Sequence, residues 1–298
     1  MGDIKLFRHG TSGVVELEGK SVVVEKTLQT LMEKNLDGFL GVRLLGSEYS
    51  TGKTHGGRID SLGIDENNGP VIIEYKRSLN ENVINQGLFY LDWLLDHRAE
   101  FTLLAMGRLG ADIESKIDWS GPRLICIAAD FTKYDEHAVS LISRNIELLR
   151  YRSFGDDLLL LELVNAGTAA VESGVAGVKT ASPNKTAAEY VEQAPAPLLD
   201  LYHALEAFLL ALGDVQVKVT KTYIAYRRIK NFACVEVQSK KLNLFLKIDP
   251  KSVTLEPGFT RDVSKIGHFG TGDLEVIIDS EAALERAKLL IPQSYENS

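Results

Sequence analysis

Residues 56–77 read GGRIDSLGIDENNGPVIIEYKR, and this stretch decides how the first half of the chain folds. Its pattern predicts two short strands, Arg58–Asp65 and Val71–Lys76. The intervening Glu66–Pro70 is rich in residues that adopt positive φ or favour a turn, so we expect a β-hairpin.

The second predicted strand is apolar and β-branched until it reaches Glu74 and Lys76. Side chains alternate along a strand, so these two share one face and Tyr75 lies on the other. A hairpin register can bring Asp60 beside them. Burying two carboxylates and a lysine is costly unless they bind something, so this end of the hairpin is a candidate functional site.

The sequence around the hairpin predicts an α/β domain over residues 1–165, in which helices flank a mixed central sheet. Apolar residues recur at helical spacing over 25–40 and again over 80–108, where the pattern suggests two helices divided near His97. A small hairpin is expected near the N-terminus. The other predicted elements are strands at 42–49, 122–129, 146–151 and 158–164 and a helix at 134–144.

Residues 166–197 are dominated by small and turn-forming residues without apolar periodicity, which indicates a flexible linker. A second, small α+β domain is expected over 198–298. It would begin with a helix at 198–212 and continue with alternating strands and a closing helix at 281–291.

The composition excludes several classes of protein. The net charge of −8 over 298 residues argues against a general polyanion binder, so any contact with nucleic acid must come from a local patch. No apolar run is long enough for a membrane helix, and the N-terminus has no signal-peptide core. Cys126 and Cys234 are expected as buried core residues without a metal or disulfide pattern, which fits the cytoplasm.

Asp60, thirteen intervening residues, Glu74, one residue and Lys76 form the D…ExK pattern of metal-dependent nucleases. Two carboxylates can hold Mg²⁺ together with several waters. The ion polarises a phosphate and makes hydroxide available near neutral pH, while a lysine positions that nucleophile and offsets charge on phosphate oxygens. The carbonyl oxygen of Tyr75 is a natural additional ligand.

In this context the sequence resembles the PD-(D/E)XK nuclease superfamily, in particular nuclease domains of the RecB and NucS type. The residues that match the family pattern are Glu33, Asp60, Glu74, Lys76 and the run Gln86-Gly87-Leu88-Phe89-Tyr90. Ile59 stands where the superfamily name has proline. The chain also resembles uncharacterised prokaryotic proteins in which a C-terminal domain of unknown function follows.

The resemblance implies a hydrolase that cleaves DNA with Mg²⁺ or Mn²⁺. It implies metal binding by Asp60, Glu74 and Glu33, orientation of water by Lys76, and support of the site by Gln86. Whether the enzyme is an endonuclease stays open. DNA is the expected partner, with a homodimer as a candidate assembly and no membrane. The alternative is a module on the same fold that binds nucleic acid or a partner without cleaving.

Two further groups are candidates for contact with nucleic acid. Lys53, His55 and Arg58 precede Asp60 and could meet phosphates, or could belong to a polar loop. The Gly-Lys-Thr triplet at 52–54 lacks the upstream glycine of a phosphate loop. Basic and aromatic residues interleave in the second domain, which fits either a nucleic-acid surface or a sheet with an aromatic core. The contact candidates are Lys53, Arg58, Tyr90, Arg227, Arg228, Lys240 and Lys241.

Overall fold

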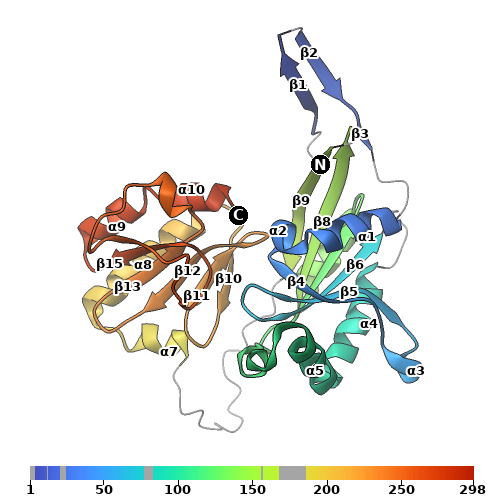
Figure 1. Ribbon diagram of the computed structural model, residues 1–298, viewed down its shortest axis with the longest axis horizontal. Helices are drawn as coiled ribbons and strands as arrows, with labels where there is room; N and C mark the ends of the chain where they lie inside the picture. Colours follow the sequence, from blue (N-terminus) through green and yellow to red (C-terminus); the bar gives the residue numbers. More distant parts are fainter. Residues whose placement is uncertain (1–3, 12, 21–24, 77–82, 156, 168–185) are drawn as a thin grey trace. The chain divides into compact units, whose positions relative to one another are not determined.

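The computed structural model describes residues 4–11, 13–20, 25–76, 83–155, 157–167 and 186–298 (Figure 1). The chain divides into two compact units, Met1–Val171 and Glu172–Ser298. Within the described residues, no helix is both long and apolar enough to cross a bilayer.

A mixed sheet forms the centre of the first unit, as the sequence predicted. Its strands are β3 (Gly19–Lys20), β4 (Val42–Ser50), β5 (Arg58–Asp65), β6 (Pro70–Lys76), β7 (Arg123–Ala128), β8 (Asn145–Phe154) and β9 (Leu158–Gly167). The order is β3-β8-β7-β6-β5-β4, and β9 also pairs with β8. The three central strands β6, β7 and β8 are parallel, whereas β4, β5 and β6 form antiparallel pairs.

Helices cover both faces of this sheet. The helices of this unit are α1 (Glu25–Lys34), α2 (Leu36–Leu40), α3 (Gly52–His55), α4 (Val83–Asp96), α5 (Arg98–Leu109), η1 (Ala111–Lys116) and α6 (Lys133–Leu141). Ile72 belongs to a buried cluster with residues of α4 and α5. Tyr75 instead reaches Ser61, whose hydroxyl donates to Glu33 of α1. Because Ile72 and Tyr75 point to opposite faces of β6, α1 and α4 lie on opposite sides of the sheet.

The β5–β6 turn forms because Asp65 holds it from within. One of its carboxylate oxygens accepts the backbone N–H of Asn67 at 2.9 Å and that of Gly69 at 2.8 Å. Asn68 adopts a φ of 60°, which asparagine tolerates better than most residues. The hairpin predicted from this stretch is therefore confirmed, with Ser61 opposite Ile73.

Arg123 lies at the start of β7, at the opposite end of the sheet from Lys76, and joins two buried carboxylates. Its Nε and Nη2 each donate to Glu147 at 2.8 Å, and Nη1 donates to Asp65 at 3.1 Å. The three side chains are at most 6% exposed. The two carboxylates raise the pKa of the Arg123 guanidinium against the opposing effect of burial, so this residue stays charged in the core.

A separate hairpin, β1 (Leu6–Gly10) and β2 (Gly13–Leu17), occupies the N-terminal segment, where the sequence predicted one. The predicted division of the 80–108 region is also confirmed, because α4 ends at Asp96 and α5 begins at Arg98. The single helix expected over 25–40 is two helices, which meet at Asn35.

The second unit is an α+β fold, as predicted, with a six-stranded antiparallel sheet in the order β10-β11-β12-β13-β15-β14. The strands are β10 (Gln216–Val219), β11 (Ile224–Arg227), β12 (Asn231–Val237), β13 (Leu242–Leu246), β14 (Thr260–Asp262) and β15 (Leu274–Ile278). The helices are α7 (Ala187–Glu192), α8 (Ala196–Leu210), η2 (Pro250–Ser252), α9 (Glu281–Ala287) and α10 (Ile291–Glu296).

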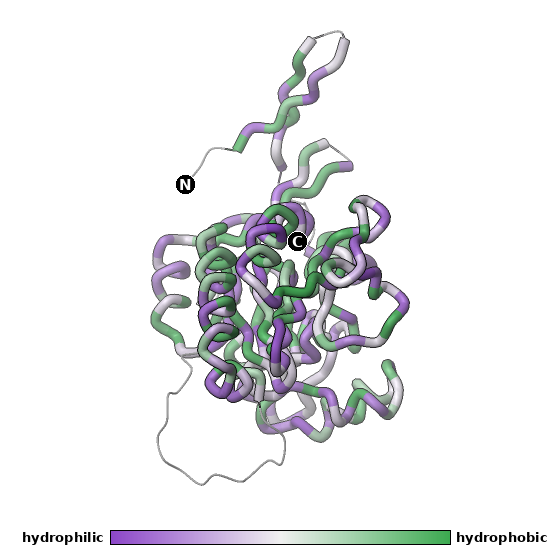
Figure 2. The backbone as a smooth tube through the Cα atoms, turned by 90° about the vertical axis from the view of Figure 1, so that its left-hand side faces the viewer, coloured by the Kyte–Doolittle hydropathy of each residue, from purple (hydrophilic) through white to green (hydrophobic). Residues whose placement is uncertain are grey.

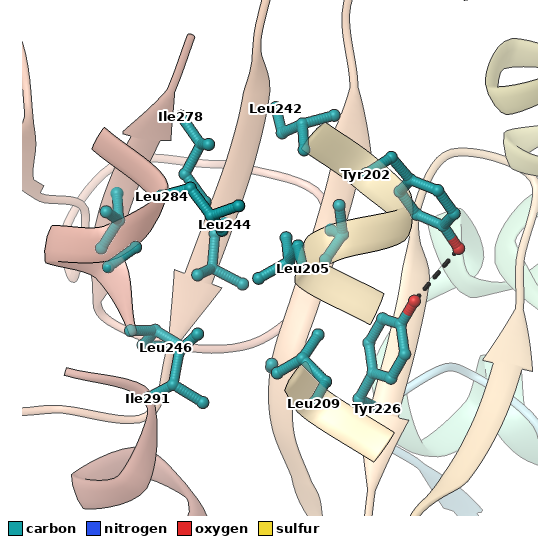
Figure 3. Packing of buried hydrophobic residues seen from close by; sticks show 14 of the residues in the cluster. Tyr202, Leu205, Leu209, Tyr226, Leu242, Leu244, Leu246, Ile278, Leu284 and Ile291 are labelled. Carbon is teal, nitrogen blue, oxygen red and sulfur yellow. Dashed lines mark hydrogen bonds between the residues drawn. The ribbon is translucent and has the colours of Figure 1, made fainter. Parts of the chain in front are cut away.

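The core of the second unit lies between its sheet and its helices. Leu205 and Leu209 of α8 pack toward Leu244 and Leu246 of the sheet (Figure 3). At one side of this core the hydroxyls of Tyr202 and Tyr226 lie 3.1 Å apart, and both donate to Glu206. Both hydrophobic and hydrophilic positions recur along the helices in Figure 2, as expected when each helix buries one face.

The linker expected over 166–197 is interrupted at both ends by regular structure. Strand β9 continues to Gly167, and α7 begins at Ala187, which is 3% exposed in the core of the second unit. Thr186 and Glu189 form a capping box that starts α7. This Thr-x-x-Glu signal outweighs the small-residue composition on which the linker prediction rested. Residues 168–185 lie outside the described residues.

Candidate active site

Strands β5 and β6 stop pairing with each other at the end that carries the D…ExK residues. Their ladder ends at Ser61 opposite Ile73. Beyond that point β5 remains paired with β4 as far as Arg58, and β6 remains paired with β7 as far as Lys76. The two strands are thus held by their outer neighbours, and the backbone between them is open where Asp60 and Glu74 lie.

Two carboxylates replace the missing ladder hydrogen bonds. The N–H of Asp60 donates to Glu74 Oε1 at 3.2 Å, and the N–H of Tyr75 donates to Asp60 Oδ2 at 3.0 Å. Glu74 is 0% exposed, and its second oxygen, Oε2, is buried without a hydrogen-bond partner among the described residues. The hairpin register therefore brings Asp60 beside Glu74, as predicted, and leaves one buried carboxylate oxygen unsatisfied.

Burial determines the protonation of this pair. It raises the pKa of Glu74 to about 8, and the nearby charge of Asp60 adds to the rise, while the Asp60 N–H and Lys76 oppose it. Burial also raises the pKa of Asp60. Burial therefore favours the protonated form of the Glu74 carboxyl, and a cation beside it would favour the ionised form.

Lys76 ends β6 at the opening between the strands. Its Nζ lies 3.5 Å from Glu25 at the start of α1, and its side chain is 15% exposed. The positive charge of Lys76 lowers the pKa of both Asp60 and Glu74 relative to burial alone. Asp60, Glu74 and Lys76 are thus electrostatically coupled, which is the grouping that the D…ExK pattern predicted.

Glu33 takes part in a network on the α1 face of the sheet. Its carboxylate accepts from Gln29 at 2.9 Å, Ser47 at 3.0 Å and Ser61 at 2.7 Å. Gln29 also donates to the carbonyl oxygen of Asp60 at 2.9 Å, so the network reaches the backbone of the site. The structure does not group the Glu33 carboxylate with Asp60 and Glu74: in the described ranges no three His, Cys, Asp or Glu side chains are placed to share a metal ion.

Gln86 and Tyr90 meet on one face of α4, as their spacing predicted. Gln86 Nε2 donates to the Tyr90 hydroxyl at 3.1 Å, and the backbone N–H of Arg58 donates to the same hydroxyl at 3.2 Å. Tyr90 is 5% exposed. This helix therefore holds the start of β5, two residues before Asp60, and its tyrosine is a structural contact rather than an open surface residue.

The glycine-rich segment before β5 folds as a short loop over Tyr90. Gly52 and Gly56, with φ of 78° and 65°, bound the helical turn α3. A Cβ at Gly57 would lie 2.5 Å from the Tyr90 ring, so a glycine is required there for the loop to approach α4. Lys53 is exposed on α3. Arg58 is 67% exposed and pairs with Glu48 at 2.6 Å.

The basic residues predicted in the second unit do not form one patch. Arg227 is 5% exposed, and Arg228 stacks over the ring of Tyr295 at 4.5 Å. Both precede β12, whereas Lys240 and Lys241 follow it, so the two pairs lie at opposite ends of that strand. The interleaved aromatic residues Tyr223, Tyr226, Phe232 and Phe245 are all buried, which favours the aromatic-core interpretation.

The comparisons with known proteins give one match over the second unit and one over both units. Residues 187–298 match a family model described as Domain of unknown function (DUF5655). An uncharacterized protein of Haemophilus influenzae is 26% identical over 310 residues, covering 99% of this chain and 100% of the relative. No solved structure matches the chain.

The DUF5655 match begins at Ala187, the first residue of α7. The matched region therefore coincides with the secondary structure of the second unit. The Haemophilus relative aligns over both units, so its similarity extends to the part of the chain that carries Asp60, Glu74 and Lys76.

Sequence reasoning missed several residues that shape the site. Gln29, Ser47 and Ser61 hold Glu33, and Glu25 pairs with Lys76. Gln29 lies four residues before Glu33 on α1, a spacing that places both on one helix face and could have revealed the pair. Ser47 and Ser61 carry no such signal, because only the pairing of β4 with β5 brings them together.

We expect the stability of the first unit to fall as the pH rises from about 4.5 to about 8 in the absence of divalent ions. In that window the unfolded chain releases the Glu74 proton while the native state keeps it, so unfolding becomes easier. The shift in the Glu74 pKa corresponds to a loss of up to about 5 kcal/mol across this window, and Glu74→Gln should remove most of it. Urea unfolding at several pH values, followed by tryptophan fluorescence, measures the effect.

Glu48→Gln is the matched control, because the hydrogen bond from Lys26 lowers the pKa of the Glu48 carboxyl. That variant should keep the fall in stability toward pH 8. An unchanged pH dependence in Glu74→Gln would show that the Glu74 carboxyl is ionised in the native state at neutral pH.

Proposed function

We propose that the first unit is a nuclease of the PD-(D/E)XK type that hydrolyses phosphodiester bonds in DNA with Mg²⁺ or Mn²⁺. The observation that carries the proposal is the buried Glu74 carboxylate, which faces Asp60 and has one oxygen without a partner among the described residues. A buried carboxyl group with an unpaired oxygen is costly in either protonation state, and a divalent cation would stabilise its ionised form.

The donor set fits a hard divalent ion. Glu74 Oε2 is available, Asp60 supplies a second carboxylate, and both groups lie where β5 and β6 separate. Mg²⁺ is commonly held by one or two carboxylates and completes its shell with waters and substrate oxygens. Two protein carboxylates are therefore sufficient, and Glu33 is not required as a ligand. A bound ion would polarise the phosphate and lower the pKa of a water.

The chain's own groups would act on the substrate as follows. Lys76 would hold its positive charge toward the phosphate and the attacking water, where charge develops in the transition state. Its neighbour Glu25, at 3.5 Å, would keep the ammonium group in place. Gln86 and Tyr90 would not contact the substrate. They would act indirectly, because they fix the start of β5 and hence the position of Asp60.

A second reading is a module that binds nucleic acid or a partner without cleavage. It is favoured by the two backbone hydrogen bonds that Asp60 and Glu74 accept, which give both carboxylates a structural role. This reading predicts binding that chelators do not affect, and no cleavage.

We expect the full chain to cleave DNA in millimolar Mn²⁺ and to lose this activity in EDTA. Labelled single-stranded, duplex and branched DNA should be incubated with the protein and separated on denaturing gels. The Asp60→Asn variant is the control for contaminating nucleases, because it removes a ligand charge while keeping the side-chain shape. Cleavage that persists in EDTA, or at full rate in Asp60→Asn, would overturn the proposal.

A further inference from the structure

A group of aromatic rings is formed by residues of α3, of α4 and of the junction between α4 and α5. The ring centroids of His55 and Phe89 are 4.7 Å apart, and those of His55 and His97 are 6.1 Å apart. His97 stacks on Trp93 at 4.9 Å with an interplanar angle of 18°. Four rings from two segments are therefore packed as a continuous group, although His55 and Phe89 are 34 residues apart in the chain.

Phe89 is the most exposed member of this group. The Phe89 side chain is 47% exposed, whereas Trp93 is 1% exposed and contacts the group from the core through His97. A half-exposed phenylalanine that packs against the His55 ring offers a flat apolar surface to solvent. Surfaces of this kind bind other flat rings by stacking, with little dependence on their sequence.

Tyr90 links the ring group to the strand that carries Asp60. Phe89 and Tyr90 have ring centroids 6.0 Å apart, and the Tyr90 hydroxyl accepts the N–H of Arg58, two residues before Asp60. The exposed Lys53 lies on α3 and can meet a phosphate. The exposed Asp92 lies three residues after Phe89 on α4. Its negative charge would repel phosphates, so a nucleic acid strand would lie toward the Gln86 end of the helix.

We propose that Phe89, flanked by His55, is a stacking site for an unpaired base of the DNA that is bound at the candidate active site. This inference rests on the proposed nuclease function and adds a substrate class to it. The base faces in an intact duplex are covered by their neighbours, so a stacking surface selects single strands, flaps or frayed ends.

The test measures binding of the full chain to a labelled single-stranded oligonucleotide and to its blunt duplex by fluorescence anisotropy in EDTA, where no cleavage occurs. Phe89→Ala and Phe89→Leu should each weaken single-strand binding about tenfold. Phe89→Trp should retain it, because an aromatic face is restored. Duplex binding should change by less than about twofold in all three variants.

Leu103→Ala is the matched control, since Leu103 is 69% exposed on α5 and has no aromatic surface. This variant should bind like the native chain, and thermal melts should show that every variant is folded. Wild-type single-strand affinity in Phe89→Leu would overturn the stacking site. A change of oligomeric state in Phe89→Ala with unaltered DNA binding would also overturn it, and would assign Phe89 to a protein contact.

Cleavage assays in Mn²⁺ separate this inference from the proposed function. Cleavage combined with Phe89-independent binding overturns the stacking site and leaves the nuclease proposal standing. Phe89-dependent single-strand binding without any cleavage overturns the nuclease proposal and leaves a single-strand binding site. If the native chain binds no DNA and cleaves none, both are overturned.

Discussion

Replacing Lys76 with alanine is expected to lower DNA cleavage by about 10²–10³-fold, the loss typical when one group that stabilises transition-state charge is removed. The fold should survive, because the Lys76–Glu25 pair is partly exposed and pairs of this kind contribute about 1 kcal/mol or less. Initial rates on labelled DNA in Mn²⁺, with a thermal melt of each variant, measure both effects.

Lys34→Ala is the matched control for this experiment, since Lys34 is an exposed lysine at the end of α1. It should cleave at the native rate. Cleavage by Lys76→Ala within twofold of the native rate would remove this lysine from the mechanism. In that case the role of Lys76 would be structural, through its ion pair with Glu25.

Arg123→Ala is expected to destabilise the first unit by about 3–5 kcal/mol, because it leaves Asp65 and Glu147 charged and uncompensated in the core. Asp65 also holds the β5–β6 turn through the N–H groups of Asn67 and Gly69. The loss should therefore extend to the hairpin that carries the candidate site.

The effect of Arg123→Ala can be measured in this unit separately. Both tryptophans of the protein, Trp93 and Trp119, lie in the first unit, so urea unfolding followed by tryptophan fluorescence reports on it. Lys26→Ala removes a pair in which Lys26 is 57% exposed, and should cost about 1 kcal/mol or less. A loss below about 1 kcal/mol in Arg123→Ala would show that its carboxylate partners are solvated or protonated.

The hairpin and its register could be read from the sequence because they depend on local rules. The turn residues 66–70 fix where β5 and β6 join. Alternation along β6 then places Glu74 and Lys76 on one face, and the register of the hairpin brings Asp60 of β5 next to Glu74. The Gln86–Tyr90 contact follows from helical spacing in the same way. The Thr186 capping box was equally local, but the composition of its surroundings concealed it.

The interpretation of the basic residues in the second unit could not be settled in this way. Alternation along β11 and β12 does not reveal which face a loop or helix covers. The structure shows that Tyr226 and Phe232 are core residues rather than a stacking surface, and that Arg227 is buried as well. Arg228 and Lys240 are close in sequence but lie beyond opposite ends of β12, so they form no common patch.

The sequence by itself determined the α/β and α+β classes, the hairpin and the residues that meet at its end, because periodicity and turn chemistry act over a few residues. The tertiary structure decided that β5 and β6 separate at Asp60 and Glu74, since that depends on the outer strands β4 and β7. It also decided that Glu33 joins a separate network and that His55 meets Phe89. These contacts join segments far apart in the chain, whose approach depends on packing of the whole unit.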